Sequence, residues 1–377
     1  MTIILAGGIG RSGLGGQAWA YLQYLLGFRA LGHDVFYLED CGETSSVWNW
    51  DTNQWTQELA FPAAYVRDCL EPFGFIDRWT YRTNTEAAGM PLDKLKAICA
   101  QSDLLVMRAI PLWDWRPEYD LPKRRIFIDV DPGFTQTNIA AGDHGYAAAL
   151  RHADRLFTLG QRIGAADCAV PTENWSWLKT SPPVVLSEWP WVKDPPASHF
   201  SAIMRWDGFQ DSEYEGKTYG QKDRELARFI DLPRRTSQKF RIALNGPETL
   251  AEYGWEIVPG EIATRTPQAY RQFIQQSRAE FGVAKHGYVQ MRPGWFSDRS
   301  VCYLASGLPL LIQDTGLSGW LPTGEGILTF DDWPGILGGI EAINRDYERH
   351  RRAARRLAEE YFATQKVLPA LLEAAMS

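Results

Sequence analysis

The chain has few cysteines, and its apolar residues form no long run. The five cysteines in 377 residues are widely spaced and include no Cys-x-x-Cys pair, so neither a disulfide framework nor a zinc site is indicated. No stretch approaches the ~20 apolar residues of a membrane-spanning helix. The N-terminus also lacks the basic region and the length of a signal peptide. We therefore expect a soluble cytoplasmic protein without a transmembrane segment.

An excess of basic residues is missing as well. The 39 lysines and arginines against 46 aspartates and glutamates give a net charge of −7, which argues against a broad nucleic-acid-binding face. A local basic pocket for phosphates remains compatible with this balance. The sixteen tryptophans are many, and such rings can stack on sugars. Packing in the core and between domains is nevertheless the role expected for most of them.

The length of the chain exceeds what one compact core usually organises, so we expect two domains. Within residues 186–199, Pro190, Pro195 and Pro196 exclude regular structure. The boundary is placed there. Residues 1–193 would form an N-terminal domain, residues 194–350 a C-terminal domain, and residues 351–377 helices that pack back toward the N-terminal domain.

Strands and helices alternate in both halves, which is typical of an α/β fold with parallel sheets. The first half begins with a buried strand at residues 2–6, a glycine-rich loop and a helix at 17–31 that ends before Gly32. Its further strands are expected at residues 35–38, 104–107, 125–130 and 155–159. In the second half, strands are expected at 200–204, 241–244, 255–258, 283–284 and 309–312, and helices at 222–230, from Thr266-Pro267 onward, and at 300–306.

Three segments carry a family resemblance. Gly15-Gly16-Gln17, a helix, and then Gly32-His33-Asp34-Val35 resemble the opening of the two-Rossmann (GT-B) glycosyltransferases. The resemblance is to the large group with sucrose-phosphate synthase-like and glycogen synthase-like enzymes. It implies two Rossmann-like domains that face each other across a cleft. It also implies that the amides of Gly15 and Gly16 approach the phosphate or the sugar of the donor.

The other two segments lie in the second half. Arg205 and Lys222 are similar to the Arg and Lys that neutralise the donor diphosphate in this class, with a longer spacing here. The segment PGWFSDRSVCYLASGLPLLIQDTGL (residues 293–317) resembles the donor motif of the class. This likeness implies that a helix begins in the cleft and presents four residues to the donor: Ser297, Asp298, Arg299 and Ser300. The two glutamates of the motif fall at Gly294 and Cys302, so Asp298 is the best substitute for the missing carboxylate.

The resemblance implies a transferase that binds its acceptor in the N-terminal domain and a nucleotide-sugar, most simply a UDP-sugar, in the C-terminal domain. No metal or organic cofactor is expected. Retaining chemistry would need no protein nucleophile, whereas inverting chemistry would need a base to deprotonate the acceptor. Asp129 and Asp131 follow a buried strand, and Asp131 is the first candidate for this base, with His144 next. A turn role for both aspartates stays open, and Lys285, before His286, could reach a phosphate.

Two alternatives remain at this stage. Gly8, Gly10 and Gly13 fit a dinucleotide fingerprint, with Glu39 or Asp40 as its acidic residue, which would indicate an NAD(P)-dependent oxidoreductase. The missing glutamate pair leaves room for a non-catalytic GT-B protein that only binds a nucleotide-sugar.

Overall fold

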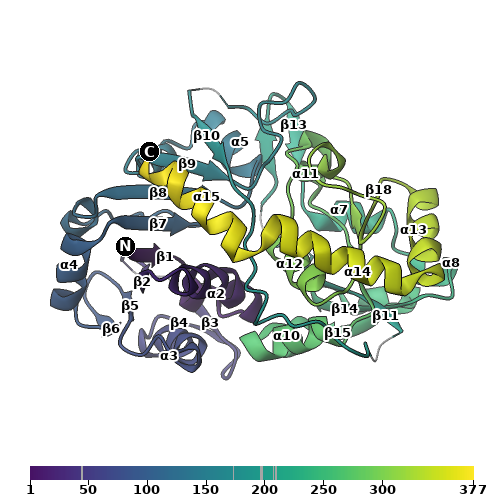
Figure 1. Cartoon of the computed structure of the whole chain (residues 1–377), viewed down its shortest axis with the longest axis horizontal. Coiled ribbons are helices and arrows are strands. Elements are labelled where there is room, and N and C mark those ends of the chain that lie inside the picture. Colours follow the sequence, from purple (N-terminus) through teal and green to yellow (C-terminus); the bar gives the residue numbers. More distant parts are fainter. Residues whose placement is uncertain (44–45, 173, 196–197, 207, 209) are drawn as a thin grey trace.

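The computed structural model describes residues 1–43, 46–172, 174–195, 198–206, 208 and 210–377. It contains two parallel sheets that lie side by side, and each is covered by helices (Figure 1). The predicted α/β architecture with two Rossmann-like halves is confirmed. Within the described residues, no helix combines the length and the apolar character that crossing a bilayer requires.

The N-terminal sheet has eight strands, and all neighbouring pairs are parallel except the last. In spatial order the strands are β10 (Trp177–Lys179), β9 (Arg155–Thr158), β8 (Arg124–Asp129), β7 (Leu104–Arg108), β1 (Thr2–Ala6), β2 (Asp34–Asp40), β5 (Trp79–Arg82) and β6 (Ala87–Gly89). Its helices are α1 (Ile9–Ser12), α2 (Gly15–Ala30), α3 (Ala60–Leu70), α4 (Leu92–Gln101), α5 (Phe134–Ala140) and α6 (His144–Leu150). A hairpin of β3 (Val47–Asn49) and β4 (Gln54–Thr56) follows β2. The central strands are apolar on both faces because helices cover both sides of a parallel sheet.

The C-terminal sheet has six parallel strands. Their order is β15 (Glu256–Pro259), β14 (Lys239–Asn245), β11 (His199–Arg205), β16 (Ala279–Gly282), β17 (Leu310–Gln313) and β18 (Ile327–Phe330). Its helices are α7 (Lys222–Ala227), α8 (Leu232–Arg235), α9 (Gly260–Thr264), α10 (Pro267–Gln275), α11 (His286–Met291), α12 (Asp298–Ala305), α13 (Trp333–Arg345) and α14 (Tyr347–Leu357). A hairpin of β12 (Ser212–Tyr214) and β13 (Lys217–Tyr219) packs on α5 of the first half.

The last helix, α15 (Thr364–Met376), crosses back to the N-terminal half and packs on α2 (Figure 1). Gly27 of α2 allows this close approach, since a Cβ there would overlap the side chains of Leu368 and Thr364. Helix α2 is therefore buried on nearly all sides, and one apolar cluster runs through both halves of the molecule. Between β10 and β11 the described part of the chain contains no named helix or strand. The expected boundary lies in this stretch, and Pro196 is outside the described residues.

Two of the expected elements differ from the structure. The helix expected over residues 222–230 ends at Ala227, and a separate short helix, α8, begins at Leu232 with Pro233 in its first turn. The strand expected at residues 283–284 lies earlier, at β16. Glu280 is a charged residue inside this buried strand, and its pairing with Arg299 was not visible in the local pattern.

Candidate functional site

The carboxyl ends of the two sheets face each other, and polar side chains from both halves meet between them. Asp131 follows β8, and Lys285 follows β16 as the N-cap residue of α11. The Lys285 ammonium donates to Oδ1 of Asp131 at 2.6 Å, and the Tyr288 hydroxyl donates to the same oxygen. The structure thus brings together two residues that the sequence assigned to different roles, the base and the phosphate ligand.

These contacts decide the charge state of Asp131. Burial against the facing domain opposes ionisation, but Lys285 and the hydrogen bond from Tyr288 outweigh it and lower the pKa of Asp131. The carboxyl group therefore stays ionised at neutral pH. Its side chain is still 38% exposed, so a substrate hydroxyl can reach it.

Asp129 has a structural role. It is 1% exposed and accepts hydrogen bonds from the side chains of Thr135, Gln136 and Thr158 and from the amide of Asp131. Burial raises its pKa, and these four donors oppose the rise. Asp129 therefore orders the turn that carries Asp131, which agrees with the turn role left open for it.

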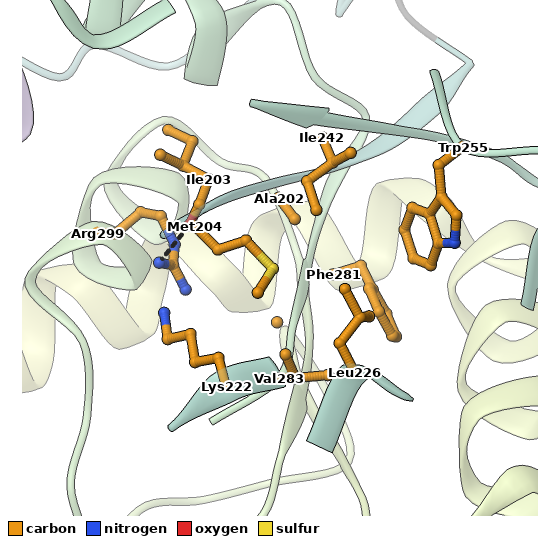
Figure 2. Close-up of a pocket in the computed structure, with 11 residues that line it drawn as sticks. Ala202, Ile203, Met204, Lys222, Leu226, Ile242, Trp255, Phe281, Val283 and Arg299 are labelled. Atoms are coloured by element: carbon orange, nitrogen blue, oxygen red, sulfur yellow. Dashed lines mark hydrogen bonds between the residues drawn. The ribbon is translucent and has the colours of Figure 1, made fainter. Parts of the chain in front are cut away.

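A cationic group lies at the carboxyl edge of the C-terminal sheet. Lys222 is the first residue of α7, and Arg299 is the second residue of α12. Figure 2 shows both charged ends at one end of a pocket with an apolar wall, and Trp255 at the other end. The Arg299 guanidinium donates to Glu280 at 2.6 Å and to the carbonyl oxygen of Ile203 at 2.9 Å, which fixes its position.

Lys222 is different, because no hydrogen bond or ion pair engages its ammonium in the described part of the chain. Burial has the largest effect on the pKa of Lys222, and the nearby positive charges of Arg299 and Lys285 add to it. Together they lower this pKa to about 7. An anion beside these cations would offset the repulsion among them and raise the pKa of Lys222 again. The local charge therefore favours a bound anion.

Helix α12 begins between the two domains, as the donor motif implied. The Ser297 hydroxyl caps it by accepting from the amide of Arg299 at 3.2 Å. Asp298, in the first turn, pairs across the cleft with Arg108 at 2.5 Å. Ser297 and Ser300 are buried and line a second pocket beside the first. Arg108, the last residue of β7, is 1% exposed and was not predicted to belong to the site.

Gly15 and Gly16, the two glycines predicted to approach the donor, pack against other parts of the protein. A Cβ at Gly15 would overlap the carbonyl group of Thr266, and one at Gly16 would press on the ring of Tyr270. Both positions thus allow α2 to approach α10 across the domain boundary, and a contact of their amides with a donor stays a prediction.

The dinucleotide alternative is disfavoured by the same region. The carboxylate of Glu39 accepts from the amides of Gly10 and Arg11 at 2.8 and 2.7 Å, and the ring of Tyr21 fills the space beside Gly7. Asp40 is held by Arg116 and Tyr119. Both acidic residues are thus engaged by the protein rather than turned toward a ribose, and the side chains of Tyr21 and Ile110 pack closely against Gly7 and Gly8 of the loop.

Two other predicted residues lie at the surface. Arg205 is exposed at the end of β11, and His144 is exposed at the first position of α6. Neither is brought into contact with Asp131 or Arg299 by a described hydrogen bond or ion pair. The nitrogen Nδ1 of His286 accepts from the amide of Gly220 at 3.3 Å. No group of three or more His, Cys, Asp or Glu side chains in the described ranges is arranged to hold a metal ion.

Sequence reasoning missed Arg108, Tyr288 and Glu280. A signal existed for two of them, because Arg108 ends the apolar run LLVMR and Glu280 interrupts the buried run AEFG. A charge at such a position must be paired or lie at a functional edge. Tyr288 gave no comparable signal, since a tyrosine in a short helix is usually a packing residue.

Comparison with known proteins yields a match in structure alone. No family model matches the chain, and no curated protein matches its sequence. An α-glucosyltransferase in complex with UDP is 12% identical over 100% of both chains, with a TM-score of 0.63. An α-glucosyltransferase in complex with UDP and a 13-mer DNA gives a TM-score of 0.62 at 12% identity, again over 100% of both chains. Anabaena Alr3699/HepE in complex with UDP and glucose is 12% identical over 99% of both chains, with a TM-score of 0.59. The chain therefore has the two-domain GT-B fold of glycosyltransferases.

Proposed function

We propose that this protein is a glycosyltransferase that moves a sugar from a nucleotide-sugar, most simply a UDP-sugar, to an acceptor held by the N-terminal domain. The observation that carries the proposal is Lys222, which lies beside Arg299 at the carboxyl edge of the C-terminal sheet and has no partner among the described residues. Ligands of open α/β sheets bind at this edge. Two GT-B structures with bound UDP add support, since their folds match over the full chain.

In this proposal, Lys222, Arg299 and the N-terminus of α12 stabilise the diphosphate as the bond to the sugar breaks. Arg299 is already fixed by Glu280 and by the carbonyl oxygen of Ile203, so it needs little rearrangement during the reaction. These groups supply the positive charge, and we propose no metal or organic cofactor. The Oδ1 atom of Asp298 would face the donor while its Oδ2 stays bound to Arg108.

Asp131 is the proposed base if the transfer inverts the sugar configuration. Its bond to Lys285 must then be exchanged, because a carboxylate held by an ammonium is a weak base. The donor diphosphate, bound at Lys222 and Arg299, offers Lys285 an alternative partner, since Lys285 is near enough to Lys222 for the two charges to repel each other. Donor binding would in this way free Asp131 for the acceptor.

The acceptor and the compartment are also part of the proposal. The net charge of −7 supports an acceptor other than nucleic acid. The α-glucosyltransferase in complex with DNA counts against this point, so DNA is the competing acceptor class. Cys69, Cys99, Cys168 and Cys302 form no disulfide in the described structure, which supports a cytoplasmic location.

Nucleotide titrations test the function. We expect isothermal titration calorimetry to show saturable binding of UDP-glucose or of another UDP-, GDP- or dTDP-sugar. The variant Lys222→Met should weaken this binding by about 10-fold or more, the equivalent of one charge-assisted hydrogen bond. Lys217→Met, at an exposed position of β13, is the matched control and should bind as the wild type does. Enhanced NADH fluorescence without any binding of these nucleotide-sugars would instead favour the oxidoreductase.

Donor affinity should depend on pH through Lys222. Its pKa near 7 in the free protein means that binding an anion above this pH requires the uptake of a proton. The dissociation constant for UDP-glucose should thus stay flat below about pH 7 and rise by up to about 10-fold per pH unit above it. Titrations between pH 6 and 9 measure this slope. In Lys222→Arg, which stays charged throughout, the slope should vanish, and an equal slope in both proteins would rule out Lys222 as its source.

A further inference from the structure

Three tryptophans gather on the β3–β4 hairpin, which follows β2 at the carboxyl edge of the N-terminal sheet. The ring of Trp48 lies edge-on to Trp50 and to Trp55, with centroid distances of 6.2 and 5.6 Å. Trp48 and Trp50 are half-buried, whereas Trp55 is 68% exposed. It is the most exposed large apolar side chain among the described residues. Packing therefore does not account for Trp55.

The hairpin borders the cleft between the domains. Asp51 in its turn forms an ion pair with Arg265 of the C-terminal half. Trp50 lies over the glycine loop, where its Nε1 atom would be 3.4 Å from a Cβ at Gly13. Figure 1 shows β3 and β4 beside α2 and α3, on the side of the N-terminal half that is turned toward α10. The indole cluster thus continues from the cleft to the outer surface.

The charge around the cluster restricts what can bind to it. Residues 41–66 contain three acidic residues, Glu43, Asp51 and Glu58, and no lysine or arginine. A phosphate backbone or a sulfated chain would meet repulsion from these carboxylates, and Arg265, the cation that contacts the turn of the hairpin, is already paired with Asp51. This segment therefore does not suit DNA or another polyanion.

The remaining side chains of the hairpin are hydrogen-bonding groups. Asn53, Gln54 and Gln57 are exposed, and Asn49 accepts from the amides of Asp51 and Thr52. Flat aromatic faces with amides beside them match the two surfaces of a pyranose ring. Its C–H face packs on an indole, and its hydroxyl edge binds amides. A purely apolar partner would cover the side-chain amides of Asn53 and Gln54 without offering them hydrogen bonds.

We propose that the β3–β4 hairpin binds the acceptor and that the acceptor is an uncharged oligosaccharide, one of whose sugar rings stacks on Trp55. This assignment rests on the proposed transferase function and names the substrate class of the same cleft. The sugar on Trp55 would lie away from the reacting end, and the chain would run past Trp50 toward Asp131. An acceptor of several sugar units fits an indole cluster that extends outward.

Intrinsic tryptophan fluorescence tests this surface without turnover. The full-length protein is titrated with neutral hexasaccharides of gluco-, galacto- and manno-configured units. Sulfated oligosaccharides and a 13-nucleotide DNA duplex are titrated in parallel. We expect saturable binding of at least one neutral hexasaccharide and none of the anionic ligands. Trp55→Ala should raise its dissociation constant by about 10-fold or more, as truncation of a central aromatic anchor does. Because Trp55→Ala also removes a fluorophore, calorimetry is used to measure the dissociation constants of this variant independently of the fluorescence signal.

Two controls separate stacking from general destabilisation. Trp55→Phe keeps a flat ring and should recover most of the affinity. Ile76→Ala removes an apolar side chain of similar exposure, 61%. Ile76 precedes β5, so it lies where the strands of the same sheet begin, away from the carboxyl ends that border the cleft. This variant should bind the hexasaccharide as the wild type does. UDP-glucose binding should be the same in all these proteins.

The outcomes distinguish the acceptor site from the function. Three results would each overturn the proposal. The first is equal hexasaccharide affinity of Trp55→Ala and the wild type, the second is binding of only the sulfated chains or the DNA, and the third is no binding of any hexasaccharide. In these cases intact, Lys222-dependent UDP-glucose binding would leave the transferase function standing. Loss of nucleotide-sugar binding in the wild type would count against the function itself.

Discussion

Replacing Asp131 by Asn should lower turnover by about 10²–10⁴-fold, which is the usual effect of removing a general base. The introduced amide would keep the shape of the side chain and could still accept a hydrogen bond from Tyr288, but it could not take a proton from the acceptor. Donor affinity should not fall, because the substitution removes a negative charge beside Lys285 and Lys222. The measurement is UDP release from UDP-glucose, with a bound oligosaccharide or water as the acceptor.

Asp143→Asn provides the matched control for this experiment. Asp143 caps α6 by accepting from the amide of Tyr146 at 2.7 Å, and an Asn at this position keeps a good cap. Its turnover should remain at the wild-type level. If Asp131→Asn is folded and also fully active, Asp131 is not the base, and retaining chemistry becomes the better explanation. His144 is a weak replacement, because no described hydrogen bond or ion pair joins it to Asp131 or to the partners of Asp131.

Replacing Arg299 by Ala should damage both stability and donor binding. Glu280 is 0% exposed in its side chain, and Arg299 is the cation that pairs with it. Leaving this carboxylate unpaired in the core should cost about 3–5 kcal/mol of unfolding free energy. Donor affinity should fall by a further 1.5–3 kcal/mol, roughly the value of a hydrogen bond to a charged group. Urea unfolding and calorimetry measure the two losses.

A double variant separates these two effects. Arg299→Met combined with Glu280→Gln removes both charges at similar volume, so most of the stability should return. The loss of donor affinity should persist. Arg349→Ala, which breaks an exposed ion pair with Glu325, is the control and should unfold at nearly the same urea concentration as the wild type. Wild-type affinity for UDP-glucose in the double variant would mean that Arg299 only stabilises the fold.

The contrast between Arg299 and Lys222 explains why single substitutions at this edge are not equivalent. Arg299 is built into the protein by two hydrogen bonds, whereas Lys222 has none in the described structure. A change at Lys222 therefore reports mainly on the ligand. A change at Arg299 reports on the core as well, so it requires the compensated variant.

The sequence alone determined the architecture of this protein. Alternating apolar strands and helices predicted two α/β halves, and Thr266-Pro267 predicted the start of α10, where the Thr266 hydroxyl accepts from the amide of Ala269 at 3.1 Å. The start of α12 at Ser297 and Asp298 was implied by the family resemblance, whereas the local pattern predicted the helix at residues 300–306. These features are local, because strand burial, helix capping and turn formation depend on residues a few positions apart.

Only the tertiary structure decided how the site is assembled. Asp131 and Lys285 are 154 residues apart, and Arg108 and Asp298 are 190 residues apart. Their pairing depends on which strand ends face each other across the cleft, and no local pattern records this. The glycines at 15 and 16 show the same limit. Their sequence predicted a close backbone approach, but the partner in this structure is α10 of the other half. Local chemistry thus indicated which kinds of residue the site would contain, whereas the packing of the two domains decided which of these residues pair with one another.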